Sequence, residues 1–301
     1  MNASVHAIPS VMAGESTSLR HPTVIIDPQH GHMQAGATYS SALPGDADAI
    51  HAITSGMGLR IVYQPQYDLQ TRRIISAEAL LRWSHPKYGE VPPTLLIVMV
   101  NRLNLHRQLF NLVVTQVIDV LSCLCNMGAE VPIAVNASVD TVCEPGIQDF
   151  LASKMWNACL PPRLLKVEMT EELPVLDELS LSACLNSLRA KGFALSLDDF
   201  GAGFATLNML IKMPFDEVKI DGTFIRDMTT NAHSHAIVST IITLARRLKV
   251  KLVAEGIENE AMITSLRKMG CHIGQGYALS RPMERGDFLK YQLENNMGTA
   301  S

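Results

Sequence analysis

Acidic side chains recur where short apolar, β-branched runs of this sequence end. Six positions have this character: Glu78, Glu168, Asp198, Asp199, Glu255 and Glu258. A carboxylate at the end of a buried strand loses hydration, which costs free energy unless a cation or a hydrogen-bond donor meets it. A series of such carboxylates at successive strand ends indicates a shared metal site on one rim of an α/β barrel.

The predicted metal ligands are all hard oxygen atoms. They belong to four carboxylates and one amide: Glu78, Glu168, Asp198, Asp199 and Asn136. With no histidine or cysteine partnering them locally, they suit Mg²⁺ or Mn²⁺ rather than zinc. Because Asp198 and Asp199 point in different directions from a strand end, one can bridge two ions while the other holds the second ion or a water. Glu255 could also hold the second ion, and paired ions suit phosphoryl displacement.

Two further residues fit such a site. Lys219 lies between Val218 and Ile220, so an inward-facing ammonium there needs an anionic partner. Gln275, between two glycines, could orient a ligand. Most of these candidates also have an ordinary structural explanation. Glu78, Asp198 and Asp199 could be helix caps, and Asn136 could form a turn. Lys219 and Asp221 could be an ion pair on the surface. Their joint placement at successive strand ends favours the metal site.

The elements that must position these residues follow from the hydrophobic pattern. Strands are predicted at residues 59–67, 74–82, 131–136, 164–169, 193–197, 217–220, 251–254 and 273–279. The first two are joined by a short turn and should pair antiparallel. The others alternate with predicted helices at 103–127, 146–157, 177–190, 234–248, 260–269 and 285–294, which implies parallel pairing. Eight strands in this order favour a modified TIM barrel, whose reacting groups gather at the strand C-terminal ends, over a doubly wound sheet.

Composition restricts the class of protein. In 301 residues, 47% hydrophobic content supports a sizeable core, and a net charge of −4 gives no basic footprint for a nucleic-acid polymer. Residues 1–45 are expected to form a loose, flexible extension, and a short helix is expected from Asp46, capped by Asp46 or Asp48 and ended by Gly56 and Gly58. No signal peptide is evident and the apolar stretches fall short of a membrane span, so a cytoplasmic protein is expected.

Several motifs in one order make the chain resemble the EAL-domain family of cyclic di-GMP phosphodiesterases. The motifs are YQP at 63–65, EALLRW at 78–83, HP at 85–86, VNAS at 135–138, VEMTE at 167–171, DDFG at 198–201, KID at 219–221, VAEGIE at 253–258 and GQGYALSRP at 274–282. The resemblance covers residues 46–294 and assigns 46–301 to the domain. It implies metal-dependent hydrolysis of cyclic di-GMP to linear pGpG, with Mg²⁺ or Mn²⁺ in a two-metal site, and a homodimer.

The resemblance also implies a role for each matching residue. Glu78, Asn136, Glu168 and Asp198 match primary metal ligands, while Asp199 and Glu255 serve the second metal. Lys219 matches the lysine that hydrogen-bonds the attacking water, and Glu171 the glutamate that steadies the loop after DDFG. The substrate contacts implied are Gln64, Leu80, Arg82, Asn136, Asp221, Glu258 and Gln275, with Arg82 suited to a phosphate.

One departure from the family pattern leaves alternatives open. Residues 202–206 read Ala-Gly-Phe-Ala-Thr where the family usually carries more hydroxyl groups, in a loop that couples the second-metal site to a dimer contact in relatives. The chain could therefore be a catalytically impaired module that acts as a cyclic di-GMP receptor or protein-interaction regulator. A barrel phosphodiesterase for another nucleotide is a third hypothesis.

Overall fold

The computed structural model of the chain describes residues 43–170, 177–201 and 207–297. All of them belong to one compact unit, residues 40–301. Most of the predicted extension, together with Glu171 and the loop 202–206, lies outside the described residues.

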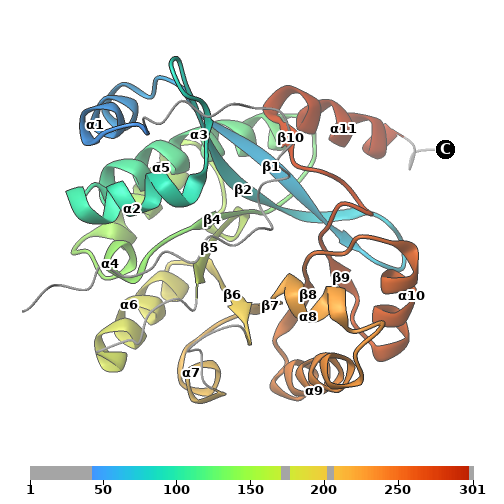
Figure 1. Cartoon of the computed structure of the whole chain (residues 1–301). Helices are drawn as coiled ribbons and strands as arrows, with labels where there is room; N and C mark the ends of the chain where they lie inside the picture. The colour runs from blue at the N-terminus through green and yellow to red at the C-terminus, as the bar shows by residue number, and fades with distance from the viewer. Residues whose placement is uncertain (1–42, 171–176, 202–206, 298–301) are drawn as a thin grey trace, which may run out of the picture. The chain divides into compact units, whose positions relative to one another are not determined.

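Within this unit, eight strands close into a barrel in the order β1-β2-β4-β5-β6-β7-β8-β9 and back to β1 (Figure 1). Strand β1 is antiparallel to β2 and β9, and the other barrel pairs are parallel. The predicted barrel with an antiparallel first strand is confirmed. Two short strands pair at its margins, and the full set is β1 (Leu59–Asp68), β2 (Ile74–His85), β3 (Gly89–Val91), β4 (Ile133–Asn136), β5 (Leu165–Thr170), β6 (Ala194–Phe200), β7 (Glu217–Ile220), β8 (Lys251–Ala254), β9 (Ile273–Gly274) and β10 (Met283–Glu284).

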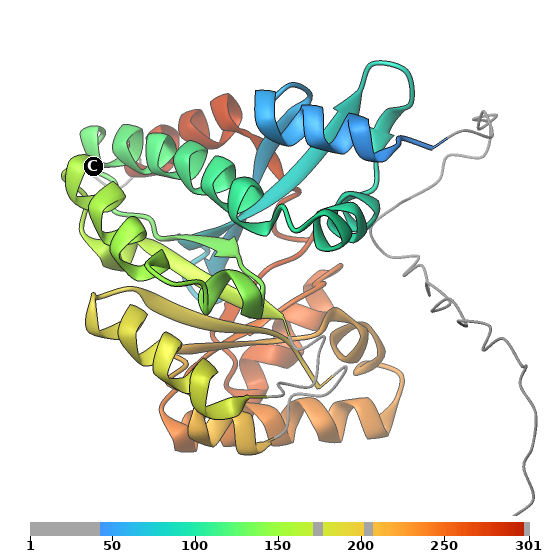
Figure 2. The ribbon, with the colours of Figure 1, turned by 90° about the vertical axis from the view of Figure 1, so that its left-hand side faces the viewer.

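Helices surround the strands (Figure 1), and in Figure 2 the teal-green α3 lies above the strands and the orange α9 below them. They are α1 (Asp46–Ser55), α2 (Pro93–Leu103), α3 (His106–Asn126), α4 (Val139–Val142), α5 (Ile147–Asn157), α6 (Glu178–Ala190), α7 (Leu207–Lys212), α8 (Gly222–Asp227), α9 (Ala232–Leu248), α10 (Glu260–Met269) and α11 (Arg285–Met297), with a 3₁₀ turn at Pro162–Leu164. This arrangement buries one face of each long helix against the strands.

Local side chains explain the antiparallel hairpin of β1 and β2. At the turn, the Asp68 carboxylate accepts hydrogen bonds from the backbone N–H groups of Gln70 at 2.9 Å and Thr71 at 2.6 Å. Such an Asx turn reverses the chain within a few residues, as the short predicted turn requires. The hairpin sets Glu78 opposite Gln64 in the ladder.

Three predicted boundaries are wrong. The helix predicted at 103–127 begins later, as α3 at His106, because Leu103 ends the unpredicted helix α2 and Asn104 takes a left-handed conformation (φ 53°). The strand predicted at 273–279 pairs only to Gly274, because the backbone at Gly276 packs so closely on Ile257 that a Cβ would lie 2.2 Å from its nitrogen. At α1 the cap residue is Gly45, whose N–H donates to Asp48 Oδ2 at 2.8 Å.

Helix α3 has the length and apolar composition of a membrane-spanning helix, but half of it is buried in the protein core. Among the helices that the structure describes, it alone is long and apolar enough to cross a membrane, contrary to the expectation that no stretch would be. Half of its apolar window is buried within the protein, and Val114, Val117 and Leu121 are fully buried in the core. Packing against the barrel accounts for this apolar character, since each such buried side chain contributes roughly 1.5–3 kcal/mol.

The parallel strands bring one polar set into the barrel interior. Residues two apart on a strand face the same side, and buried polar residues occupy such pairs on three successive strands: Lys166 and Glu168, Ser196 and Asp198, and Glu217 and Lys219. The second member of each pair lies nearer the strand C-terminal end. The register of the strands therefore brings Glu168, Asp198 and Lys219 together in a polar rim at the C-terminal ends.

Candidate active site

Lys219 lies at the centre of the acidic cluster. Its Nζ atom is 3.1 Å from Glu78 Oε2, 2.6 Å from Glu168 Oε1, 3.1 Å from Asp198 Oδ1 and 2.8 Å from Glu255 Oε1. The lysine is completely buried. Carboxylates from four separate segments therefore meet at one ammonium group, as the sequence predicted for the acidic series.

The cluster holds more negative than positive charge. Burial would lower the pKa of Lys219, but the surrounding carboxylates, Asp198 foremost, outweigh burial and raise it well above its usual value. Burial and like charges raise the pKa values of Glu168 and Glu255 well above the usual range. Glu78 is the contrast: burial opposes its ionisation, but Lys219 and other donors outweigh burial and lower its pKa. One ammonium cannot neutralise four carboxylates, so the cluster favours further positive charge.

The donor set fits divalent cations. Ligand oxygens of Glu78, Glu168 and Asp198 all lie within 4.8 Å of one another, and so do those of Asp198, Asp199 and Glu255. The second oxygen of Glu168, Oε2, is buried without a hydrogen-bond partner. A buried carboxylate oxygen without a partner is costly unless a cation meets it. Two overlapping oxygen-only groups therefore match the two-metal arrangement predicted from the sequence.

Metal binding should stabilise the fold. At a free Mn²⁺ concentration about 100-fold above the dissociation constant, we expect the melting temperature to rise by roughly 5–10 °C, which corresponds to about 2.7 kcal/mol. In Glu168→Gln, which removes the charge from the unpartnered oxygen, the rise should be smaller. Differential scanning fluorimetry with and without EDTA measures both. Equal rises in the two proteins would contradict the assignment.

Asn136 and Asp199 complete the predicted ligands. Asn136 Nδ2 donates to Glu78 Oε1 at 3.2 Å, which leaves its amide oxygen available to a cation. Asp199 has a left-handed backbone (φ 54°), and its N–H donates to Asp198 Oδ1 at 2.9 Å. The pairing register of β6 and β7 shifts between Leu197 and Phe200, which lets both adjacent aspartates contribute to one cluster.

The metal-free protein should show an Asp199-dependent loss of stability as pH rises. Burial, with Asp198 and Asp221 nearby, raises the Asp199 pKa from 3.8 to about 7. Between those values the folded state binds the proton more tightly than the unfolded chain, so its free energy of unfolding falls as pH increases. Asp199→Asn lacks this proton and tolerates the same backbone. The free energy of unfolding, measured with urea in EDTA, should therefore rise in the variant relative to the wild type between pH 4.5 and pH 7.5. The same difference between the two proteins at both pH values would contradict the raised pKa.

Glutamines and an arginine adjoin the cluster. Gln275 Nε2 donates to Glu78 Oε2 at 2.8 Å and to Gln64 Oε1 at 3.1 Å. Arg82 lies on the same face of β2 as Glu78 and Leu80, four and two residues away respectively. Burial lowers the Arg82 pKa, and in the described part of the chain its guanidinium has no carboxylate within ion-pair distance. Such a guanidinium suits an incoming phosphate.

The other predicted residues lie at the edge of the cluster or away from it. Asp221 caps α8, accepting from the Thr223 N–H at 2.6 Å, yet is near enough to help raise the Asp199 pKa. Glu258 has an exposed side chain, and its backbone N–H contacts Met262 Sδ at 3.4 Å. Glu171 lies outside the described residues.

Sequence reasoning missed interior polar residues one layer below the cluster. Lys166 Nζ and Glu217 Oε1 form a buried ion pair at 2.5 Å, and the buried Gln66 contacts both Gln275 and the buried Ser76. The available signal was their spacing, because each lies two residues before or after a predicted site residue on the same strand.

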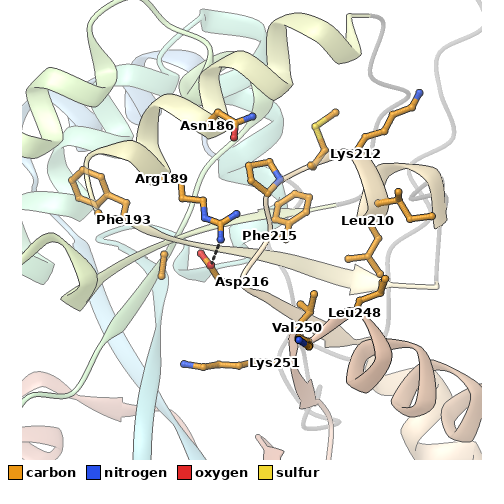
Figure 3. A pocket seen from close by; sticks show the side chains of 16 residues that line it. Asn186, Arg189, Phe193, Leu210, Lys212, Phe215, Asp216, Leu248, Val250 and Lys251 are labelled. Carbon is orange, nitrogen blue, oxygen red and sulfur yellow. Dashed lines mark ion pairs between the residues drawn. The ribbon is translucent and has the colours of Figure 1, made fainter.

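A separate cleft of about 930 Å³ lies at the opposite end of the barrel (Figure 3). Ala194 and Lys251 begin β6 and β8, and Asp216 precedes β7, so the cleft lies at the strand N-terminal ends. Arg189 points toward Asp216 within it, with nitrogen and oxygen 3.7 Å apart. It contains none of the predicted site residues and is distinct from the acidic cluster.

Comparison with known proteins agrees with the sequence motifs and with the barrel. The EAL domain family matches residues 47–282, and the chain belongs to this family. A solved structure titled "PaMucR Phosphodiesterase, c-di-GMP complex" superposes with a TM-score of 0.76 at 32% identity, covering 81% of this chain and 99% of that one. An EAL domain protein from Listeria monocytogenes gives 0.72 at 26% identity, covering 82% and 97%.

Curated relatives are longer than the region matched. Cyclic di-GMP phosphodiesterase RocR of Pseudomonas aeruginosa is 32% identical over 249 residues, which cover 83% of this chain and 63% of RocR. Cyclic di-GMP phosphodiesterase PA2567 of the same organism is 30% identical over 232 residues, covering 77% of this chain and 40% of its own length. The chain thus spans less than two thirds of either relative.

Proposed function

We propose that this protein hydrolyses one phosphodiester bond of cyclic di-GMP, giving linear pGpG, with Mg²⁺ or Mn²⁺ bound by the acidic cluster. The observation that carries the proposal is the convergence of Glu78, Glu168 and Asp198 around Lys219 in a domain of the EAL family. The phosphodiesterase names of RocR and PA2567 and the ligand of the PaMucR structure support the choice of substrate.

The cation ligands divide into two groups that share Asp198. Glu78, Asn136, Glu168 and Asp198 would hold one ion, and Asp198, Asp199 and Glu255 the other. Bound divalent cations supply positive charge that offsets the charge developing on phosphate oxygens and favour ionisation of water. The protein itself must position the substrate and the attacking water.

Three further groups would perform that positioning. Lys219, held protonated by its carboxylates, would donate a hydrogen bond from Nζ to the attacking water. The Arg82 guanidinium would bind a phosphate on the adjacent rim, and Gln64, beside Gln275, would hydrogen-bond the ligand. Leu80 lies half-buried between Arg82 and Glu78 on β2 and would contact a base or ribose. We assign contacts with the substrate to Asp221 and Glu258, and to Glu171, which lies outside the described residues, the role of steadying the loop after residues 198–201.

A hydrolysis assay tests the proposal. Purified protein with Mn²⁺ or Mg²⁺ should convert cyclic di-GMP to pGpG, separated by ion-pair chromatography, and EDTA should stop the reaction. Binding of cyclic di-GMP without turnover at saturating metal would favour the receptor alternative. Turnover of another cyclic nucleotide in preference to cyclic di-GMP would reassign the substrate.

We further propose that the catalytic domain begins near Asp46, at the first described helix.

We also propose that the protein is a homodimer. The family resemblance supports the dimer, and Ile211 on α7 offers a 70% exposed apolar side chain. Light scattering after size-exclusion chromatography should give twice the chain mass.

A further inference from the structure

Four polar side chains in the barrel interior form one hydrogen-bonded series that ends on Glu78. Ser76 Oγ donates to Gln66 Oε1, and Gln66 Nε2 donates to Gln275 Oε1 at 2.9 Å. Gln275 Nε2 then donates to Glu78 Oε2 at 2.8 Å. Gln66 is completely buried, and Ser76 and Gln275 are at most 5% exposed. Ser76 and Gln66 contact none of the cluster carboxylates directly.

The carboxylate fixes the direction of the whole series. An ionised Glu78 only accepts hydrogen bonds, so Gln275 must turn its amide nitrogen toward it and its oxygen toward Gln66. Gln66 must then present its own nitrogen to Gln275 and its oxygen to Ser76. A hydroxyl can donate, so Ser76 completes the series without an unpaired atom. A series in the opposite direction would place the Gln275 oxygen against the Glu78 carboxylate.

The series also orients a second site residue. The other N–H of Gln275 donates to Gln64 Oε1 at 3.1 Å, which occupies the Gln64 oxygen. Gln64 Nε2 is turned toward the Ser280 carbonyl, 3.4 Å away. Gln64 is therefore presented as a hydrogen-bond donor at the place where we expect substrate.

Packing alone does not require polar residues at these positions. Gln66 and Ser76 are paired across β1 and β2 inside the barrel, where branched apolar side chains are the usual filling. Burying an amide is costly, roughly 1–3 kcal/mol, unless it is fully hydrogen-bonded. Ser76 Oγ and Gln66 Oε1 pair with each other, and the Gln66 amide nitrogen is satisfied through Gln275, which belongs to the site.

We propose that Gln66 and Ser76 are positioning residues: they hold the amide of Gln275 in the one direction that the Glu78 carboxylate accepts, and thereby keep the Glu78 carboxylate and the Gln64 amide in place for metal and substrate. This inference rests on the proposed function, in which Glu78 binds metal and Gln64 binds substrate. The effect on metal affinity can be measured without turnover.

The decisive comparison is Gln66→Glu against Gln66→Met. Glutamate keeps the shape of glutamine, but its carboxylate cannot donate to Gln275 and drives that amide to turn its oxygen toward Glu78. Methionine has similar length and imposes no direction. By calorimetric Mn²⁺ titration at pH 8 without substrate, we expect Gln66→Glu to weaken binding roughly 10- to 100-fold and Gln66→Met by clearly less, about threefold. The KM for cyclic di-GMP should rise in the same order.

A residue that only fills space predicts no such order in Mn²⁺ affinity, because the cost of burying a carboxylate would then appear in the stability of the fold and not in the metal site. Equal or weaker effects of Gln66→Glu than of Gln66→Met would therefore overturn the proposal. Should Gln66→Glu fail to fold, Ser76→Ala is compared with Ser196→Ala, which deletes another buried hydroxyl, one that donates to Glu217 at 3.1 Å. We expect Ser76→Ala to weaken Mn²⁺ binding about threefold or more and Ser196→Ala to leave it within about twofold.

Equal effects of the two serine variants would also overturn the proposal. A wild-type protein that binds Mn²⁺ with this order of variants yet leaves cyclic di-GMP intact would contradict the proposed function and leave the positioning role standing. The two failures are therefore distinguishable.

Discussion

Glu78→Ala is expected to lower the hydrolysis of cyclic di-GMP at least about a thousandfold. Glu78 contacts Lys219, Gln275 and Asn136 and belongs to the first ligand group, so its loss removes a cation ligand and the group that orders its neighbours. Metal charge at a phosphate is worth several kcal/mol in the transition state, and each 1.36 kcal/mol is tenfold in rate. The fold should survive, because Lys219 keeps three other carboxylates. Chromatographic rates at saturating Mn²⁺ measure the loss.

The matched control is Glu130→Ala, which removes an exposed glutamate paired with Arg163 on the surface. Exposed ion pairs contribute about 0–1 kcal/mol to stability, so this variant should keep wild-type rates and melting temperature. Wild-type turnover by Glu78→Ala would show that the acidic cluster is not the metal site.

Lys219→Met is expected to lower kcat roughly 10²- to 10⁴-fold while changing KM much less, because the ammonium acts on the attacking water rather than on ground-state binding. The same change should destabilise the metal-free fold by about 3–5 kcal/mol, because four carboxylates lose their buried cation. Added Mn²⁺ should restore more stability to the variant than it gives the wild type. Steady-state kinetics and calorimetry in parallel measure the two effects.

Lys166→Met separates catalysis from stability. Lys166 is also buried and paired with a carboxylate, Glu217, but lies one layer below the site. Its loss should cost stability without lowering the kcat of the folded fraction. Equal losses of kcat in Lys166→Met and Lys219→Met would mean that Lys219 has only a structural role.

Much of the fold and the acidic cluster could be predicted because the order of the strands determines which strand ends lie close together. Parallel strands place their C-terminal ends on one rim, so carboxylates after separate apolar runs had to approach one another. The meeting of Glu78, Glu168, Asp198 and Glu255 at Lys219 confirms that reasoning. What the spacing could not give was the number of carboxylates contacting one ammonium, which depends on side-chain rotamers.

The remaining errors have specific physical causes. Helix α2 was not predicted, and the following helix was expected to begin at residue 103, because the left-handed conformation of Asn104, which separates α2 from α3, leaves no mark in the apolar pattern. The early end of β9 depends on the close approach of Gly276 to Ile257, a tertiary contact. Gln66 and Ser76 escaped notice because polar residues on a strand usually face solvent, whereas here they complete a series that ends on a charged group.

The central claim is that carboxylates from separate strands jointly bind divalent cations. Anomalous diffraction from wild-type crystals grown with Mn²⁺ tests it most directly, because manganese is located independently of any assay. We predict a strong anomalous peak among the carboxylate oxygens of Glu78, Glu168 and Asp198, absent from crystals grown in EDTA. Manganese found only elsewhere on the protein, with this cluster empty at saturating concentration, would contradict the account.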